Sequence, residues 1–226
     1  MKKLLVGSFI LFLSANVFAG EVSQYAGPYA GLHFGYSQGD SKGYETDTGV
    51  ANGTTADKGS LSKYIFGGDV GYNKSISNNF ILGIEADFEN RNAKNMVNLM
   101  QPDGNPWLDT VETKIQSAYS VRLRVGRVFN DDKTMVFLTG GFAAADISKS
   151  YTITGLQISQ SKWQSGYTTG LGIEHFINNS FSVKSEYRYS DYGKSNLDVG
   201  AIIPGFSEHS KYENEHSVRF GLMYHF

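Results

Sequence analysis

Apolar and polar residues alternate with a period of two along most of this chain. The segment FILGIEADFEN, residues 80–90, has apolar residues at even positions from Phe80 to Phe88 and mainly charged ones at odd positions from Gly83 to Glu89. Successive side chains of a strand point to opposite faces, so the pattern predicts a strand with one apolar and one polar face. Similar alternation predicts eight strands, at about 28–37, 62–73, 80–90, 113–129, 134–146, 163–177, 180–192 and 214–226.

The fifth segment, TMVFLTGGFAAAD at 134–146, is apolar on both faces. A short buried helix is the alternative there, because continuous apolar runs do not distinguish the two structures. Gly140 and Gly141 argue against the helix, since glycine is a poor helix former. We therefore expect a strand here as well.

The connections between these segments alternate in length. After the second, fourth and sixth strands come about six, four and two or three residues, whereas about 24, 22, 16 and 21 residues follow the first, third, fifth and seventh. This predicts an up-and-down meander with tight turns at one end and long loops at the other. A meander of eight strands removes its unpaired edges by closing into a barrel.

The first 19 residues, MKKLLVGSFILFLSANVFA, have two lysines, an apolar run over 4–13 and a final small residue, Ala19. This order is typical of a secretory signal peptide. A retained membrane helix needs about 18 apolar residues, and Gly7 and Ser14 interrupt this run. We expect residues 1–19 to be cleaved, leaving 20–226 as one barrel domain.

Two closed barrels fit the alternation, a soluble one with an apolar inside and a membrane one with an apolar outside. The polar face interleaves glycines with charges of both signs, which suits a narrow interior better than a solvated surface. We therefore predict an all-β, eight-stranded antiparallel transmembrane barrel; a lipocalin-like barrel is the alternative, and extraction without detergent would identify it. The predicted lumen charges are Asp69, Glu85, Asp87, Glu89, Arg122, Arg124, Glu174, Lys184, Glu186, Arg188 and Arg219.

Charge and cysteine content exclude two further classes. Without the two leader lysines, 18 basic and 22 acidic residues remain, and 18 − 22 gives a formal charge of −4. A nucleic-acid binder would show a basic stripe, so no nucleic-acid partner is expected. The chain contains no cysteine, so disulfides do not hold the fold together.

Three stretches resemble the small outer-membrane β-barrel family of Gram-negative bacteria, the porin-family or surface-antigen proteins related in architecture to OmpA and OmpX. They are GPYAGLHFGYSQGD at 27–40, GLGIEHFINNSFSVKSEYRYSDYG at 170–193 and VRFGLMYHF at 218–226. The resemblance implies an outer-membrane location among lipids and lipopolysaccharide, and a role in envelope integrity, surface antigenicity or adhesion to a host or surface ligand through the loops. Phe226 resembles the terminal signal read by the outer-membrane assembly machinery, although it could equally be one more lipid contact.

Candidate chemistry is sparse. A lipid-modifying enzyme would need a histidine and a serine close together on a lipid-facing strand, but His216 and Ser217 are expected on opposite faces, so we predict no enzyme, no catalytic residue and no metal or cofactor. Some members of the resembled family bind hemin, and the predicted loop at 201–216 offers His209, Tyr212 and His216 as weak candidate ligands. A narrow pore is the other alternative, although eight strands leave an interior about wide enough for side chains alone.

Overall fold

The computed structural model describes residues 23–47, 54–77, 79–100, 106–129, 132–153, 156–197 and 206–226. The predicted signal peptide, residues 1–19, lies outside them, so its removal stays a prediction. Within the described residues no helix is long and apolar enough to cross a bilayer. The strands are β1 (Gly27–Asp47), β2 (Thr54–Ser77), β3 (Phe80–Met100), β4 (Pro106–Phe129), β5 (Thr134–Ile153), β6 (Leu156–Phe176), β7 (Phe181–Asp191), β8 (Lys194–Leu197) and β9 (Phe206–His225).

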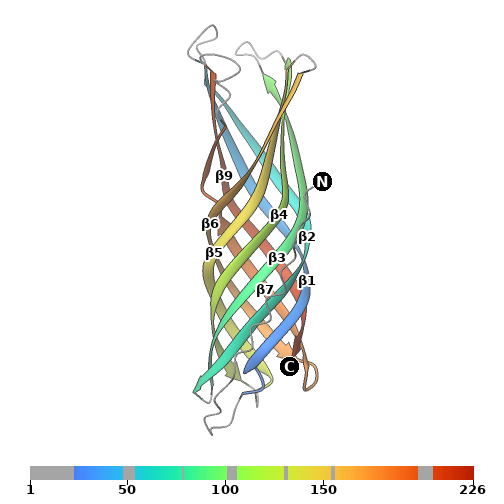
Figure 1. Ribbon diagram of the computed structural model, residues 1–226, viewed down its shortest axis with the longest axis vertical. Coiled ribbons are helices and arrows are strands. Elements are labelled where there is room, and N and C mark those ends of the chain that lie inside the picture. Colours follow the sequence, from blue (N-terminus) through green and yellow to red (C-terminus); the bar gives the residue numbers. More distant parts are fainter. Residues whose placement is uncertain are drawn as a thin grey trace, which may run out of the picture.

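The strands form one closed antiparallel barrel (Figure 1), in which each strand from β1 to β6 pairs with the next and β9 pairs with β7, β8 and β1. β7 and β8 follow one another along β9 in a single register, with Ser190 opposite Glu215 and Lys194 opposite Lys211. Between them Gly193 has a φ of 74°, a conformation that favours glycine. The two segments therefore share one position in the wall, and the described residues form the predicted eight-stranded barrel.

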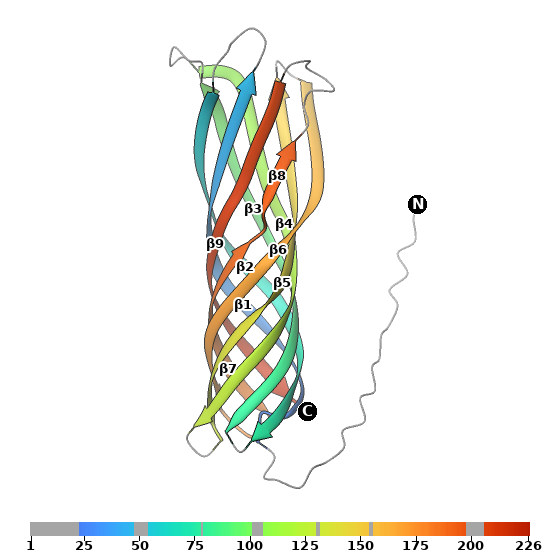
Figure 2. The ribbon, with the colours of Figure 1, turned by 90° about the vertical axis from the view of Figure 1, so that its left-hand side faces the viewer.

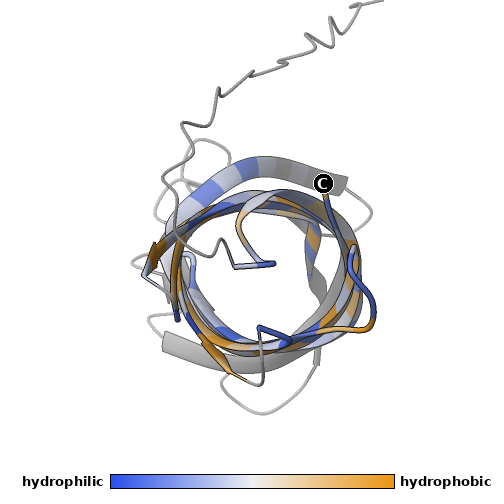
Figure 3. Cartoon of the chain, turned by 90° about the horizontal axis from the view of Figure 1, so that it is seen from below, coloured by the Kyte–Doolittle hydropathy of each residue, from blue (hydrophilic) through white to orange (hydrophobic). Residues whose placement is uncertain are grey.

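The wall is apolar outside and polar inside, because its exposed large side chains are hydrophobic and most of its buried ones are polar or charged. Figure 3 shows the two kinds of residue alternating along the strands, seen along the barrel axis. In a membrane barrel lipid solvates the outer face, so large apolar side chains remain accessible there. Outward-facing residues with 41 to 62% of their surface exposed include Leu32, Phe34, Val70, Ile84, Val121, Leu123, Leu138, Leu171, Val183, Val218 and Leu222. Tyrosine and tryptophan rings meet at one margin of this belt, with Tyr36–Tyr64 centroids 5.7 Å and Tyr119–Trp163 centroids 5.4 Å apart.

We call the end where β2 passes into β3, β4 into β5 and β6 into β7 the turn end, and the opposite end the loop end. The carboxyl-terminal residue lies at the turn end (Figure 2), where the Phe226 N–H donates to the Pro28 carbonyl over 3.1 Å. The predicted long loops are wrong in length, because strands occupy much of those stretches: β1 continues to Asp47, β3 to Met100, and β9 begins at Phe206. A spanning strand needs only about 9–11 residues, so the long strands continue well beyond the apolar belt.

β5 confirms the uncertain fifth strand and explains why it is apolar on both faces. Its inward residues join two apolar clusters that lie inside the barrel near opposite ends. Met135 and Phe137 pack in the cluster at the turn end, and Ala143 and Ala145 pack in the cluster at the loop end. These positions are apolar because they lie inside the barrel on either side of its charged middle part, and not within that part.

Candidate functional site in the barrel lumen

The structure places all eleven of the charged residues assigned to the lumen inside the barrel. Their relative exposures are at most 6%, and they come from β2, β3, β4, β6, β7 and β9. The two-residue period of each strand directs these side chains inward while their sequence neighbours face outward. Burial of so many charges is tolerated only where each finds a partner of opposite sign.

Arg122 lies at the centre of the buried charges. Its guanidinium donates to Glu85 and to Glu186, and it lies 3.2 Å from the Asp87 carboxylate. The same guanidinium donates to the Thr139 hydroxyl over 3.1 Å. Glu85 is directly opposite Arg122 on the neighbouring strand, whereas Glu186 reaches it from β7. The ion pairs of Arg122 therefore connect β3, β4 and β7 across the lumen.

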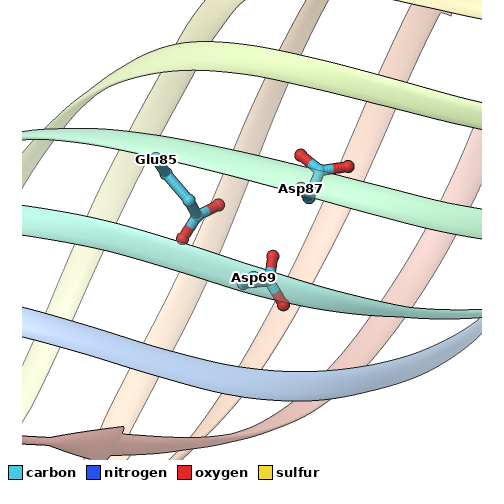
Figure 4. Close-up of side chains that lie close together, drawn as sticks. All are labelled: Asp69, Glu85 and Asp87. Atoms are coloured by element: carbon cyan, nitrogen blue, oxygen red, sulfur yellow. The ribbon is translucent and has the colours of Figure 1, made fainter. Parts of the chain in front are cut away.

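Three carboxylates gather beside this arginine. Asp69 on β2 and Glu85 and Asp87 on β3 each offer an oxygen within 4.8 Å of the others (Figure 4). Oxygen donors at this spacing suit a hard cation such as Ca²⁺ or Mg²⁺. Here the chain supplies the positive charge, because the Lys184 ammonium lies 3.2 Å from Asp69 and 3.0 Å from Glu85. The cluster is thus a set of internal ion pairs.

Glu89 collects a second group of cations closer to the loop end. Arg219 donates to it over 2.5 Å and Arg91 over 2.7 Å, while Arg188 lies 3.5 Å away. Arg91 also pairs with Glu215. Arg188 joins this group to the central one, because its guanidinium nitrogens each lie 3.0 Å from a carboxylate, those of Asp87 and Glu186.

Glu174 forms the third group, near the turn end. It accepts hydrogen bonds from Arg124 and, over 2.6 Å, from the Ser182 hydroxyl, and His225 Nε2 lies 2.9 Å from it. The Arg124 guanidinium also lies 4.0 Å from the centre of the Phe137 ring. A cation over an aromatic face is stabilised by the ring quadrupole, so Arg124 marks the boundary between the charged lumen and the apolar cluster at the turn end.

Sequence reasoning missed several buried polar partners. His33 lies between two carboxylates, with Nδ1 2.6 Å from Asp69 and Nε2 3.3 Å from Glu89. The Tyr29 hydroxyl donates to Glu85 over 2.7 Å, and Arg91 extends the network beyond the predicted end of the third strand. The alternation itself was the available signal, because Asp87, Glu89 and Arg91 continue one face, as do Tyr29 and His33.

The segment Ser23–Ala26 closes the lumen at the turn end and is visible inside the ring of strands in Figure 3. The Tyr25 hydroxyl is 2.9 Å from the Lys133 carbonyl and 2.8 Å from the Glu174 carbonyl, both acceptors. The Tyr25 ring lies 4.6 Å from that of Phe176. Burial raises the pKa of the Tyr25 phenol well above its usual value, so this hydroxyl stays a hydrogen-bond donor. We call Ser23–Ala26 the floor segment of the lumen. Nothing in the sequence pattern predicted its position.

Tyr192 lies inside the barrel toward the loop end, as Tyr25 does at the turn end. It continues the inward face of β7 and packs in a cluster with Ile115, Ala118, Ala143, Ala145 and Ile147. The Arg91 guanidinium lies 5.7 Å from the centre of its ring, and burial raises the pKa of Tyr192 to about 12. The ion pairs of the lumen are thus bounded by an apolar layer on each side.

The three hemin candidates are not gathered in a described loop. β9 begins at Phe206, so the loop predicted over 201–216 is wrong for its larger part. The side chains of His209 and Tyr212 lie outside the described residues, and their hemin role stays a prediction. His216 faces outward, with Nδ1 2.5 Å from the Tyr187 hydroxyl. Ser217 faces inward, so these two residues lie on opposite faces.

Phe226 is exposed at the turn end, with 75% of its surface accessible. Its ring lies 4.9 Å from that of Tyr224. This position on the outer surface fits both the assembly-signal interpretation and a simple lipid contact, and the assembly role stays a prediction.

The apolar outer face, the polar lumen and the eight strands agree with what a comparison with known protein families finds. Residues 7–226 match the family described as outer membrane protein beta-barrel domain. This chain belongs to that family. Members of this family are outer-membrane proteins, and the exposed apolar belt is consequently the surface that contacts lipid.

Relatives extend the similarity over almost the whole chain. The 31 kDa outer-membrane immunogenic protein of Brucella melitensis is 32% identical over 214 residues, which cover 89% of this chain and 84% of the relative. The 25 kDa outer-membrane immunogenic protein of Brucella abortus is 27% identical over 240 residues, covering 98% and 96%. Among solved structures, the outer membrane protein OprG from Pseudomonas aeruginosa has a TM-score of 0.55 at 12% identity, covering 90% of this chain and 99% of that one. This last similarity supports the fold alone.

Proposed function

We propose that this protein is a closed, non-enzymatic structural barrel that stabilises the outer membrane and presents its loop end outside the cell as a surface antigen. The observation that carries the proposal is the network of buried ion pairs across the lumen, which lies in the path that a solute would have to take. Its central link runs from Glu85 on β3 through Arg122 to Glu186 on β7. Eight strands leave little room beyond such side chains.

The names of the relatives support the second half of this proposal. Two Brucella relatives are named outer-membrane immunogenic proteins, which is consistent with an exposed antigenic surface. With the turn end in the periplasm, the continuations of the long strands beyond the apolar belt would stand outside the cell. They would offer the area on which a host or surface ligand could bind.

Conductance across a planar bilayer tests the closed lumen. We expect no channel steps from the wild-type barrel or from Leu123→Ala, a matched change on the lipid face. The double variant Arg122→Ser with Glu186→Ser removes one cation and one anion from the centre, and it should produce small steps. Stable steps from the wild type would overturn the proposal in favour of a pore. A hemin titration of the same refolded barrel tests the predicted His209, Tyr212 and His216 site.

We also propose that Phe226 assists recognition by the assembly machinery. It lies at the end of β9, the strand that pairs with β1 and closes the barrel. Replacing Phe226 by Asp should slow insertion and lower the amount of protein in the outer membrane. The same replacement at Ile177, which is 58% exposed and also lies at the turn end, is the matched control. Equal yields from both variants would reduce Phe226 to a lipid contact.

A further inference from the structure

Arg127 is an arginine on the outside of the barrel. Arg122 and Arg124 occupy inward positions of β4, whereas Arg127 is on the opposite face and is exposed. The outward residues that precede it on this strand are Val121, Leu123 and Val125. Arg127 therefore interrupts the outward apolar face near the turn end, the margin at which lipid headgroups are expected.

Two phenylalanine rings flank the Arg127 guanidinium. Its central carbon lies 5.7 Å from the centre of the Phe80 ring and 5.3 Å from that of Phe129. Phe80 is directly opposite Arg127 on β3, and Phe129 follows two positions later on the same face of β4. Both rings are exposed, at 44% and 43%, so they offer apolar surface beside the charge.

No carboxylate within the described part of the chain forms an ion pair with Arg127. The guanidinium has five N–H donors in a planar fork, and ring faces satisfy none of them with an oxygen acceptor. Lys74 and Lys133 are also exposed at this end. Asp132, the nearby described acid, is instead hydrogen-bonded to Ser23 over 2.6 Å. Among the described residues, the exposed charges at this end are therefore the cations Lys74, Arg127 and Lys133.

We propose that Arg127, Phe80 and Phe129 form a binding site for the phosphodiester headgroup of a membrane phospholipid. The guanidinium fork matches the paired oxygens of a phosphate, and such charge-assisted hydrogen bonds are stronger than neutral ones. The two rings contact the first methylenes of the acyl chains, and Lys74 adds longer-range attraction for an anionic headgroup. The proposal rests on the family assignment to the outer membrane and is independent of whether the lumen conducts.

Native mass spectrometry of the refolded barrel, released from detergent micelles that contain phosphatidylglycerol, tests this site. The wild type should retain one phosphatidylglycerol more strongly than diacylglycerol, which has no phosphate. Arg127→Gln should weaken retention about tenfold, the effect of losing one charged hydrogen bond. Arg127→Lys, which keeps the charge but loses the fork, should fall between the two. The matched control is Lys162→Gln, an exposed lysine on β6 toward the loop end.

Several results would overturn the site. Equal phosphatidylglycerol retention by Arg127→Gln and the wild type would exclude Arg127 as the phosphate ligand. An equal loss in Lys162→Gln would indicate general electrostatic attraction, and equal retention of diacylglycerol would indicate apolar contact alone. Displacement of the lipid by excess inorganic phosphate would identify a free-anion site instead. The difference in gel mobility between boiled and unboiled samples checks that each variant is folded.

Discussion

Arg124 and Arg127 lie three residues apart on one strand and occupy opposite environments. Arg124 is completely buried in the lumen, donates to Glu174 and lies over the Phe137 ring. Arg127 is on the outer face between two exposed rings, and none of the carboxylates that the structure describes pairs with it. Both use an aromatic face, yet among the described residues only Arg124 of the two is paired with a carboxylate.

The comparison teaches that the two faces of this wall are stabilised by different means. Inside, each charge is held by partners on other strands, so its removal leaves an unpaired charge in a space that water barely enters. Outside, the surroundings are hydrocarbon, and a new charge has no partner at any position in the belt. The inner face is therefore sensitive to the loss of a charge and the outer face to the gain of one.

The largest expected effect comes from breaking the inner face at its centre. Arg122→Glu would place a fourth carboxylate beside Glu85, Asp87 and Glu186, and should lower the free energy of unfolding by about 3–5 kcal/mol. Urea unfolding in lipid vesicles measures it. A second reversal, Glu85→Arg on the opposing strand, should recover part of the loss. Absence of any recovery would mean that the destabilisation does not come from the charge.

A lysine on the outer face should have the next largest effect. Leu123→Lys adds a charge at a residue that is 62% exposed in the apolar belt, and should cost about 2–4 kcal/mol near the bilayer midplane. Ile76→Lys, at the turn end, is the matched control and should cost about 0–1 kcal/mol. The same unfolding measurement applies. If the two lysines are equally harmless, the outer face is not the lipid face.

The smallest effect concerns the floor of the lumen. Tyr25→Phe removes the hydroxyl shared by the Lys133 and Glu174 carbonyls and should cost about 1 kcal/mol. Because burial raises the pKa of Tyr25, folding favours its protonated form, so this contribution is present at neutral pH. It should be lost as the pH rises above about 10, where an unfolded tyrosine ionises. A wild-type advantage over Tyr25→Phe that does not shrink at high pH would contradict the buried hydrogen bond.

The alternation was sufficient to predict the strands and which side chains share a face, since the membrane requires one apolar face over about ten residues per strand. It could not predict strand ends such as Asp47 and Phe206. Around those ends the sequence is mainly polar, as in SKGYETD at 41–47 and FSEHSKYE at 206–213, and the two-residue signal disappears. Arg91, one of the partners of Glu89, was missed for a similar reason, because it lies past the predicted strand end. Tyr25 precedes the first strand, and its place in the lumen depends on contacts with residues more than one hundred positions away.

The floor segment, Ser23–Ala26, also joins strands that are far apart around the wall. The Tyr25 carbonyl accepts a hydrogen bond from Asn73 on β2, and its hydroxyl contacts Glu174 on β6. Both contacts lie inside the wall, and the contacts to β6 span 149 residues of sequence. The segment Ser23–Ala26 therefore links β2 and β6 from inside the lumen, at the end where β1 and β9 pair. Its withdrawal would break both contacts and uncover the buried Tyr25 ring, so a short segment ahead of the first strand reinforces the closed barrel from within.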